Sequence, residues 1–182
     1  MSFFKYTRIL LPIMVFTCMY GSAQTNADQE KQDKYTQFKR LIESKKYHFH
    51  ALSATSMKGR VRQLTTEYGL SLNNDSLSVD LPYFGQSYSA DFAATDLSIQ
   101  FNTTEFSYVA NPAKKGGWEI TIIPKNQPSA NKIYMSVSSS GYGTVQVTSN
   151  NRDPISYYGT INAFNDRWFT RALHAEVYRY QQ

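Results

Sequence analysis

Two of the three histidines are spaced so that their side chains share one face of a strand. His48 and His50 lie two residues apart in a stretch that alternates apolar and polar positions, and residues two apart in a strand point the same way. Such a pair can begin a zinc site, but further ligands are needed. The one remaining histidine, His174, is far away in the sequence. We therefore predict surface or cleft histidines, with no metal site and no other cofactor.

Isolated acidic residues are the next candidates, because two carboxylates can act together as acid and base in hydrolysis. Asp80, Glu105 and Glu119 fall on separate predicted strands, and nothing in their spacing requires any two of them to converge. The sequence also lacks a Gly-x-Ser-x-Gly elbow, an HExxH helix, a Walker loop and a dinucleotide glycine pattern. These features favour a protein without catalytic residues and leave a hydrolase with a dispersed carboxylate site as an alternative.

A cluster of aromatic residues is the strongest sequence indication of a binding site. It surrounds Pro82 and Gly85, residues typical of loops, and comprises Tyr83, Phe84, Tyr88 and Phe92. At the mouth of a cavity these side chains would suit an apolar or sugar-like ligand, whereas turned inward they would fill the end of a barrel. We expect Phe84 to fill the barrel end, and Tyr83 and Tyr88 to line the rim, where their hydroxyls reach water.

The segment that must position these residues, 47–161, has the period of two that is typical of half-buried strands. About nine short runs of this kind alternate with turn sequences such as Asn73-Asn74-Asp75 and Asn102-Thr103-Thr104. Short links favour antiparallel neighbours, and a long sheet must curl to hide its edges. The sequence predicts a mainly all-β fold, an antiparallel up-and-down β-barrel, with a sandwich as the alternative.

Helical patterns flank this β domain on both sides. Residues 24–46 contain a polar lead and then a narrow apolar stripe at helical spacing, formed by Tyr35, Phe38, Leu41 and Ile42. We expect this helix to cover a sheet face or plug a barrel end; binding a partner is the alternative. Residues 162–182 are ambiguous, because Asp166 can cap a helix through Trp168 while the later alternation of Leu173, Ala175 and Val177 also fits a strand.

Residues 1–23 have the pattern of a secretory signal peptide. Lys5 and Arg8 precede an apolar run that is shorter than the roughly 20 residues of a membrane-spanning helix, and small residues end the segment at Ala23. Cleavage there would give an exported chain without cysteine, located in the periplasm or cell envelope. Cys18 also stands in the outline of a lipoprotein box, although Phe16 is unsuited to one, so lipid anchoring is the less favoured alternative.

The charge of the chain is mildly basic and does not indicate a nucleic-acid binder. The sequence has 19 Lys and Arg against 14 Asp and Glu, a net charge of +5, and the excess is spread along the chain. Its densest basic stretch, Lys58-Gly59-Arg60-Val61-Arg62, is short and lacks neighbouring aromatic residues. We interpret it as a solvated loop or strand edge.

Several short motifs resemble those of domain-of-unknown-function family 4251, a family of secreted Bacteroidetes proteins. They are Leu81-Pro82-Tyr83-Phe84-Gly85, Gly116-Gly117-Trp118, and Ser149-Asn150-Asn151-Arg152 followed by Ile155, Ser156, Tyr157 and Gly159. The resemblance covers residues 47–161 and implies an exported domain of lipocalin-like topology. It implies no activity, so no functional residue is carried over from it.

Three functions are compatible with these features. The leading hypothesis is an exported, non-catalytic module that binds a small apolar or amphipathic ligand through Tyr83, Phe84, Tyr88 and Phe92. The second is a structural or protein-interaction domain of the envelope whose barrel is filled by side chains. The third is the hydrolase already mentioned. An interior cavity would favour the first hypothesis, a filled interior the second and converging carboxylates the third, and the sequence leaves the oligomeric state open.

The leader gives the first testable prediction. The intact mass of the exported protein should match a chain that begins at Gln24, with or without cyclisation of that residue to pyroglutamate. The measurement is mass spectrometry of protein purified from the host that secretes it. A mass that includes a diacylated Cys18 would contradict the prediction and would place the domain on a membrane.

Overall fold

The computed structural model describes residues 21–88, 98–114, 116–168 and 170. The first twenty residues, Cys18 included, lie outside these ranges, as do Phe92, His174 and the end of the chain from residue 171. None of the helices within the described ranges has the length and apolar character that a bilayer crossing requires.

One helix precedes nine strands in the described part of the chain. The helix is α2 (Gly21–Glu43). The strands are β1 (Lys46–Ser56), β2 (Val61–Asn73), β3 (Ser76–Pro82), β4 (Ser98–Thr103), β5 (Phe106–Pro112), β6 (Trp118–Pro124), β7 (Lys132–Val137), β8 (Tyr142–Thr148) and β9 (Ile155–Ala163). The predicted all-β antiparallel fold is confirmed.

The strands form a single antiparallel meander that curls until its first and last members meet. The order in the sheet is β4-β3-β2-β1-β9-β8-β7-β6-β5, so β1 pairs with β9, from Tyr47 opposite Ala163 to Ser56 opposite Ile155. The edges of this sheet are β4 and β5, which follow one another in the chain but do not pair. The fold is therefore a barrel that stays open between β4 and β5, because the chain turns from one layer into the other there.

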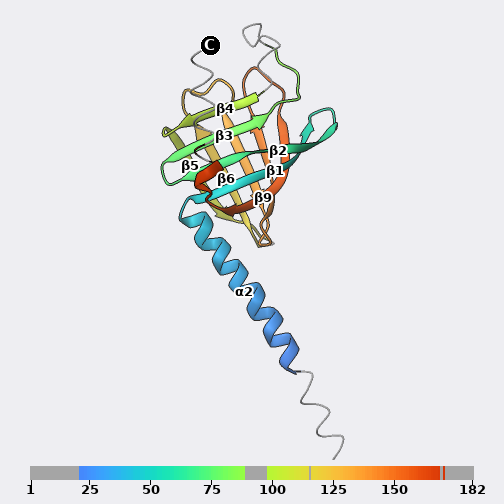
Figure 1. The fold of residues 1–182 in the computed structure, drawn as a ribbon, viewed down its shortest axis with the longest axis vertical. Helices are drawn as coiled ribbons and strands as arrows, with labels where there is room; N and C mark the ends of the chain where they lie inside the picture. The colour runs from blue at the N-terminus through green and yellow to red at the C-terminus, as the bar shows by residue number, and fades with distance from the viewer. Residues whose placement is uncertain (1–20, 89–97, 115, 169, 171–182) are drawn as a thin grey trace, which may run out of the picture. The chain divides into compact units, whose positions relative to one another are not determined.

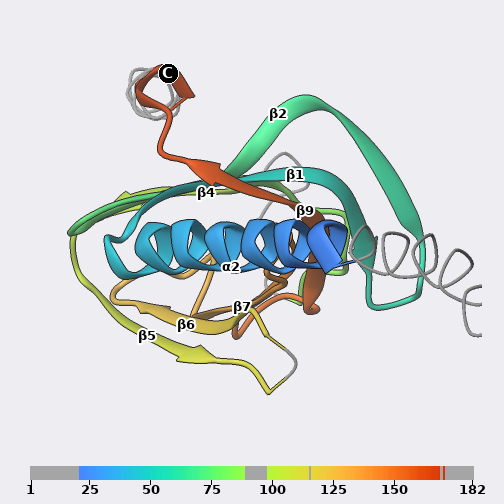
Figure 2. The same cartoon turned by 90° about the horizontal axis from the view of Figure 1, so that it is seen from below.

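The curled sheet forms two layers that enclose one core. Strands β1 to β4 run across the strands of the other layer (Figure 1), and the view from below shows β1, β2 and β4 on one side of the interior and β5, β6 and β7 on the other (Figure 2). Buried and exposed residues alternate along β6, β7 and β8, as expected for strands with one face in the core. Both layers contribute to the core, which includes Tyr47, Phe49, Leu70, Leu72, Val79, Ile99, Ile120, Ile122, Ile133, Met135, Val145 and Tyr157.

The chain divides into two compact units, Met1–Gln37 and Phe38–Gln182, and the boundary falls within α2. In the first unit the helix is polar and carries an exposed ion pair one turn apart, with Lys34 Nζ 2.7 Å from Glu30 Oε1. Exposed pairs of this kind add at most a few tenths of a kcal/mol to a helix.

The last turn of α2 belongs to the second unit and closes one end of its core. Phe38 and Ile42 are buried members of the core cluster. The Tyr108 hydroxyl donates to the Ile42 carbonyl at 3.3 Å, and the Asn74 amide donates to the Lys45 carbonyl at 2.8 Å. These bonds satisfy carbonyls at the helix end that have no partner within the helix. Three of the four residues in the apolar stripe that predicts this helix, Phe38, Leu41 and Ile42, thus pack on the core at the barrel end.

A short helical turn follows β9. Residues 166–168 are helical, and the Asn165 side chain accepts the Arg167 amide at 3.0 Å. The residue that caps this turn is therefore Asn165 and not the predicted Asp166. Trp168 is buried, and its indole N–H donates to the Glu67 carbonyl at 3.0 Å, which holds the turn against β2.

The buried end of α2 gives a second prediction. Ile42→Ala should lower the free energy of unfolding by about 2–5 kcal/mol, because it leaves a cavity where the helix meets the core. Arg40→Ala, an exposed change in the same turn, should stay within about 0.5 kcal/mol of the parent. Urea unfolding at neutral pH measures both. Equal, small losses in the two variants would show that the core does not depend on this turn.

Candidate functional site

The loop after β3 contains three of the aromatic residues that the sequence singles out. The burial of two of them, Tyr83 and Phe84, differs from what the sequence predicts. Tyr83 is only 3% exposed, and its hydroxyl donates to the carbonyls of Gln86 and Asp153 at 2.8 and 3.1 Å. Phe84 is half-buried and lies under Arg62, whose guanidinium carbon is 4.4 Å from the ring centroid. The expectation that Tyr83 lines the rim is therefore wrong, and Phe84 packs against the core but is only partly buried.

The reason is a second loop, between β8 and β9, that packs on the first. Arg152 is buried, donates to the Ser98 carbonyl at 3.1 Å and lies 5.0 Å from the Tyr83 ring centroid. The Tyr88 hydroxyl donates to the Asp153 carboxylate. Backbone bonds join the same loops, from the Tyr88 amide to the Asn151 carbonyl at 2.8 Å and from the Asp153 amide to the Gln86 carbonyl at 3.0 Å. Tyr83 therefore lies beneath the second loop and away from solvent.

A pocket of about 450 Å³ lies between the Phe84 segment and the turn that joins β1 to β2. Its lining consists of Ser56, Met57, Lys58, Arg60, Phe84, Gly85, Gln86 and Asp153. Of the four predicted ligand-binding residues, this pocket contains Phe84; Tyr83 and Tyr88 lie outside its lining, and Phe92 is not among the described residues. The four therefore do not share one described pocket, and a role for them in ligand binding stays a prediction.

The histidine pair lies on the outer face of β1, where one member is covered. His48 is buried, with Nδ1 2.9 Å from the Ser71 hydroxyl and its ring centroid 4.3 Å from that of Trp168. His50 is half-buried, and the two imidazole centroids are 6.4 Å apart. Within the described ranges no three histidine, cysteine or acidic side chains are grouped as a metal site would require. His48 packs against Trp168 and so helps to hold the turn after β9 in place.

The three candidate carboxylates lie at different places on the fold. Asp80 lies opposite Gly69 in the layer formed by β1 to β4. Glu105 belongs to the turn between β4 and β5 and lines a shallow depression with Lys125. Glu119 lies on the outer face of β6. This arrangement gives no support to a hydrolytic pair among them.

The largest of the described pockets is a groove that the sequence analysis did not identify. It measures about 690 Å³ and lies on the outer face of β6, β7, β8 and β9, next to the turns that join β5 to β6 and β7 to β8. We call it the tyrosine groove. Its lining is Pro112, Ala113, Lys114, Gly116, Glu119, Ser136, Val137, Ser138, Tyr142, Gly143, Thr144 and Tyr158.

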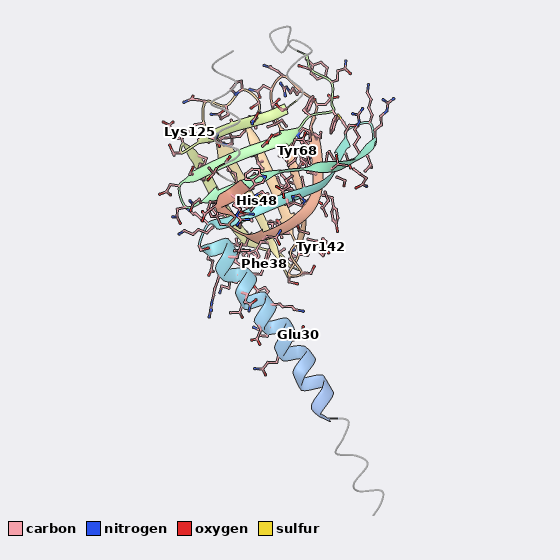
Figure 3. The ribbon with its side chains drawn as sticks, viewed as in Figure 1. Glu30, Phe38, His48, Tyr68, Lys125 and Tyr142 are labelled. Atoms are coloured by element: carbon pink, nitrogen blue, oxygen red, sulfur yellow. The ribbon has the colours of Figure 1, made fainter. Side chains whose placement is uncertain are left out.

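Two exposed aromatic rings form one wall of the tyrosine groove. The rings of Tyr142 and Tyr158 are nearly parallel, 11° apart, with centroids separated by 6.1 Å. They are 49% and 48% exposed, so both rings are accessible from the groove. Tyr142 is seen toward the end of the barrel where Phe38 lies (Figure 3), and Phe38 approaches the neighbouring Gly141.

The strands and turns around the groove hold the two tyrosines in position, and a glycine in β8 leaves space at the bottom of the groove. The Ser138 amide and hydroxyl both donate to the Tyr142 carbonyl, at 2.8 and 2.9 Å, which holds Tyr142 at the start of β8. A Cβ on Gly143 would lie 2.8 Å from the Ser136 carbonyl oxygen, so a residue without a side chain is required there. Tyr158 faces outward because its neighbour Tyr157 points into the core.

The groove offers the chemistry that hydroxylated ligands need. Its aromatic wall presents an apolar surface to the faces of sugar rings, and the hydroxyls of Ser136 and Thr144 can donate and accept hydrogen bonds. Glu119 adds an acceptor and Lys114 a donor. The sequence signals that indicate this site are Tyr142 between two glycines and the pair Tyr157-Tyr158, but neither signal shows that β8 and β9 are neighbours.

Comparison with known proteins identifies the family. The model of the DUF4251 family, a domain of unknown function, matches residues 29–161. The chain belongs to this family. A crystal structure of a DUF4251 family protein from Bacteroides eggerthii DSM 20697 has the same fold, with a TM-score of 0.53 and 11% sequence identity over 71% of this chain and 87% of that one. No curated protein matches the sequence.

Membership of the DUF4251 family covers both candidate surfaces. The matched residues include the lining of the pocket beside Phe84, the lining of the tyrosine groove and the last turn of α2. At 11% identity the solved DUF4251 structure supports the fold alone. Any function must therefore be argued from the side chains of this chain.

The buried loop tyrosine gives a third prediction, on pH dependence. Burial raises the pKa of Tyr83 to about 12, and the nearby Asp153 carboxylate adds to the increase. The unfolded chain loses this proton near pH 10.0, so the stability linked to it is complete below that pH and is lost as the pH rises toward 12. Burial also raises the pKa of Tyr157, which adds to the same decline.

Tyr83→Phe should therefore be less stable than the parent at pH 8 by about 1 kcal/mol, because the part-buried hydrogen bonds to the Gln86 and Asp153 carbonyls are lost. It should then lose less stability than the parent between pH 9 and pH 11.5. Urea unfolding across this range, with Tyr158→Phe as the control for loss of an exposed hydroxyl, measures both effects. An unchanged slope in Tyr83→Phe would contradict the assignment.

Proposed function

We propose that the protein is an exported, non-catalytic module that binds a saccharide in the tyrosine groove. The observation that carries this proposal is the exposed, parallel pair Tyr142 and Tyr158 in a groove of about 690 Å³. The secretory leader supports export to the periplasm or cell envelope. The proposal keeps the binding function of the leading sequence hypothesis but moves the ligand from the barrel interior to its outer surface.

The core supports an external site because side chains fill the interior. Tyr47, Phe49 and Tyr157 are fully buried among aliphatic residues from both layers, and the described pockets are lined by turns, loops and outward-facing residues. Tyr47 and Tyr157 also use their hydroxyls internally, toward Met135 Sδ at 3.9 Å and the Pro82 carbonyl at 2.8 Å. An apolar ligand inside the barrel would have to displace these contacts.

The polar lining favours a saccharide over an apolar ligand in the groove. An apolar ligand would remove water from Glu119, Lys114, Ser136 and Thr144 without replacing its hydrogen bonds, and each unpaired group would cost about 1–3 kcal/mol. Each sugar hydroxyl can both donate and accept a hydrogen bond, so the several hydroxyls of a saccharide can pair with all four groups. The two rings then contribute apolar contact on one side of the ligand.

Polysaccharide binding tests the proposal, and this is the fourth prediction. In native gels containing a soluble neutral polysaccharide (β-1,3-glucan, xylan, galactomannan or dextran), at least one polymer should retard the parent. Tyr142→Ala and Tyr158→Ala should each weaken the retardation, since a stacked ring contributes about 0.5–1.5 kcal/mol, roughly two- to ten-fold in affinity. Both variants should remain folded, with losses below about 1 kcal/mol.

The matched control is Tyr134→Ala. Tyr134 also faces outward, on β7, but it does not line the groove, so its removal should leave retardation unchanged. Equal weakening in all three variants would indicate a nonspecific effect and would contradict the proposal. So would a parent protein that none of the four polymers retards.

A further inference from the structure

The turn between β1 and β2 gathers cations and exposed apolar side chains at one tip. Lys58, Arg60 and Arg62 follow one another at alternate positions, and no acidic residue occurs from Lys46 to Thr66. Met57 and Val61, on either side of the turn, are 71% and 59% exposed. Exposed apolar side chains next to cations are the combination by which proteins attach to anionic lipid surfaces.

The tip extends past β3 on one side, while on the other side β1 stays paired with β9 as far as Ser56 opposite Ile155. The first residues of β2 pair with β1 alone, from Val61 opposite Thr55 to Gln63 opposite Ser53, whereas pairing with β3 begins only at Gly69. Figures 1 and 2 both show this hairpin reaching past the neighbouring strands. A projecting tip can contact a flat surface without a clash from the barrel.

The turn is held in a defined shape, so its side chains are presented together. The Gly59 amide donates to the Ser56 carbonyl at 2.9 Å, and the Ser56 amide donates to the Arg60 carbonyl at 3.1 Å. Arg62 is fixed over the Phe84 ring. Lys58 and Arg60 are exposed, and within the described ranges neither is part of an ion pair. Their charges therefore remain available to a partner.

The pocket beneath the turn fits the same partner. Met57 and Phe84 give it apolar contacts, and Lys58 and Arg60 place cations at its edge. Asp153 also lines it, but the Tyr88 hydroxyl donates to that carboxylate. At about 450 Å³ the pocket is within the size range of small-molecule sites.

We propose that the β1–β2 hairpin docks the protein onto an anionic lipid surface, with Met57 and Val61 entering the headgroup region and Lys58 and Arg60 contacting lipid phosphates. This function is independent of the tyrosine groove. A basic residue near an anionic surface contributes about 1 kcal/mol, or about five-fold in affinity. Loss of two such residues should therefore weaken binding by about 30-fold.

Vesicle co-sedimentation tests the proposal and is the fifth prediction. The protein should begin at Gln24, because the apolar leader would itself enter a bilayer, and the strands and core residues that the structure describes all lie after that point. It should bind vesicles of phosphatidylglycerol and phosphatidylcholine, bind pure phosphatidylcholine vesicles far less, and dissociate as salt is raised. Lys58→Gln/Arg60→Gln should bind about 30-fold more weakly, and Met57→Ser should also bind more weakly at unchanged charge.

The matched control is Lys46→Gln/Lys125→Gln, which removes the same charge elsewhere. Lys46 lies at the end of β1 away from the hairpin, opposite Asn73. Lys125 shares a depression with Ser76, which pairs with Asn73. All variants alter exposed residues, so their urea midpoints should match the parent. The proposal is overturned if the parent ignores anionic vesicles, if the control loses as much binding as the hairpin variant, or if the hairpin variant binds like the parent.

Discussion

The pairing of the first strand with the last is the constraint on which the rest of the structure depends. Without the β1–β9 ladder, the meander would be two separate sheets, β1 to β4 and β5 to β9, each with an apolar face open to water. The ladder joins two segments that lie far apart in the sequence, from Tyr47 opposite Ala163 to Ser56 opposite Ile155. At Gly159 a Cβ would collide with the His50 carbonyl oxygen, so the two strands approach closely only because that residue has no side chain.

Closing the sheet at this ladder restricts which parts of the molecule are available to bind a ligand. Once both layers face each other, their inward residues pack between them, and Tyr47, Phe49 and Tyr157 are fully buried there. The open side between β4 and β5 does not change this, because residues of both strands still pack on the core. Binding surfaces must then be made from outward-facing residues and from turns. Both surfaces proposed here are of that kind.

Local patterns in the sequence were sufficient to predict most of the fold, because period-two alternation and turn residues depend only on near neighbours in the chain. The same patterns failed where a distant segment covers a residue. Tyr83 is buried because Arg152 and Asp153 lie on it, seventy residues away. His48 is buried because Trp168 returns to β1. Once Pro82 ends the β3 ladder, strand alternation no longer indicates which of Tyr83 and Phe84 points inward.

The tyrosine groove was missed for a related reason. Its rings come from two strands that are neighbours in the sheet, and its floor depends on Gly143, which lies opposite Val137 and against the Ser136 carbonyl oxygen. Sequence spacing places Tyr142 and Tyr158 sixteen residues apart and does not indicate that their rings are parallel. A groove on the outside of a sheet arises from cross-strand register, which single-sequence patterns do not determine when several registers bury the same face.

Strand β9 runs from the base of the hairpin to the tyrosine groove. Because its side chains alternate between the two faces of the sheet, the two binding functions can be tested by separate substitutions. Its first residue, Ile155, lies opposite Ser56 at the base of the hairpin, and Tyr158 lies in the wall of the groove. Inward residues of β9, such as Tyr157 and Ile161, support the core beneath both surfaces, so changing them would disturb both at once. Outward residues such as Tyr158 contact one surface only. Because successive residues of a strand face opposite ways, one strand can hold the fold with alternate side chains and leave the others free for binding.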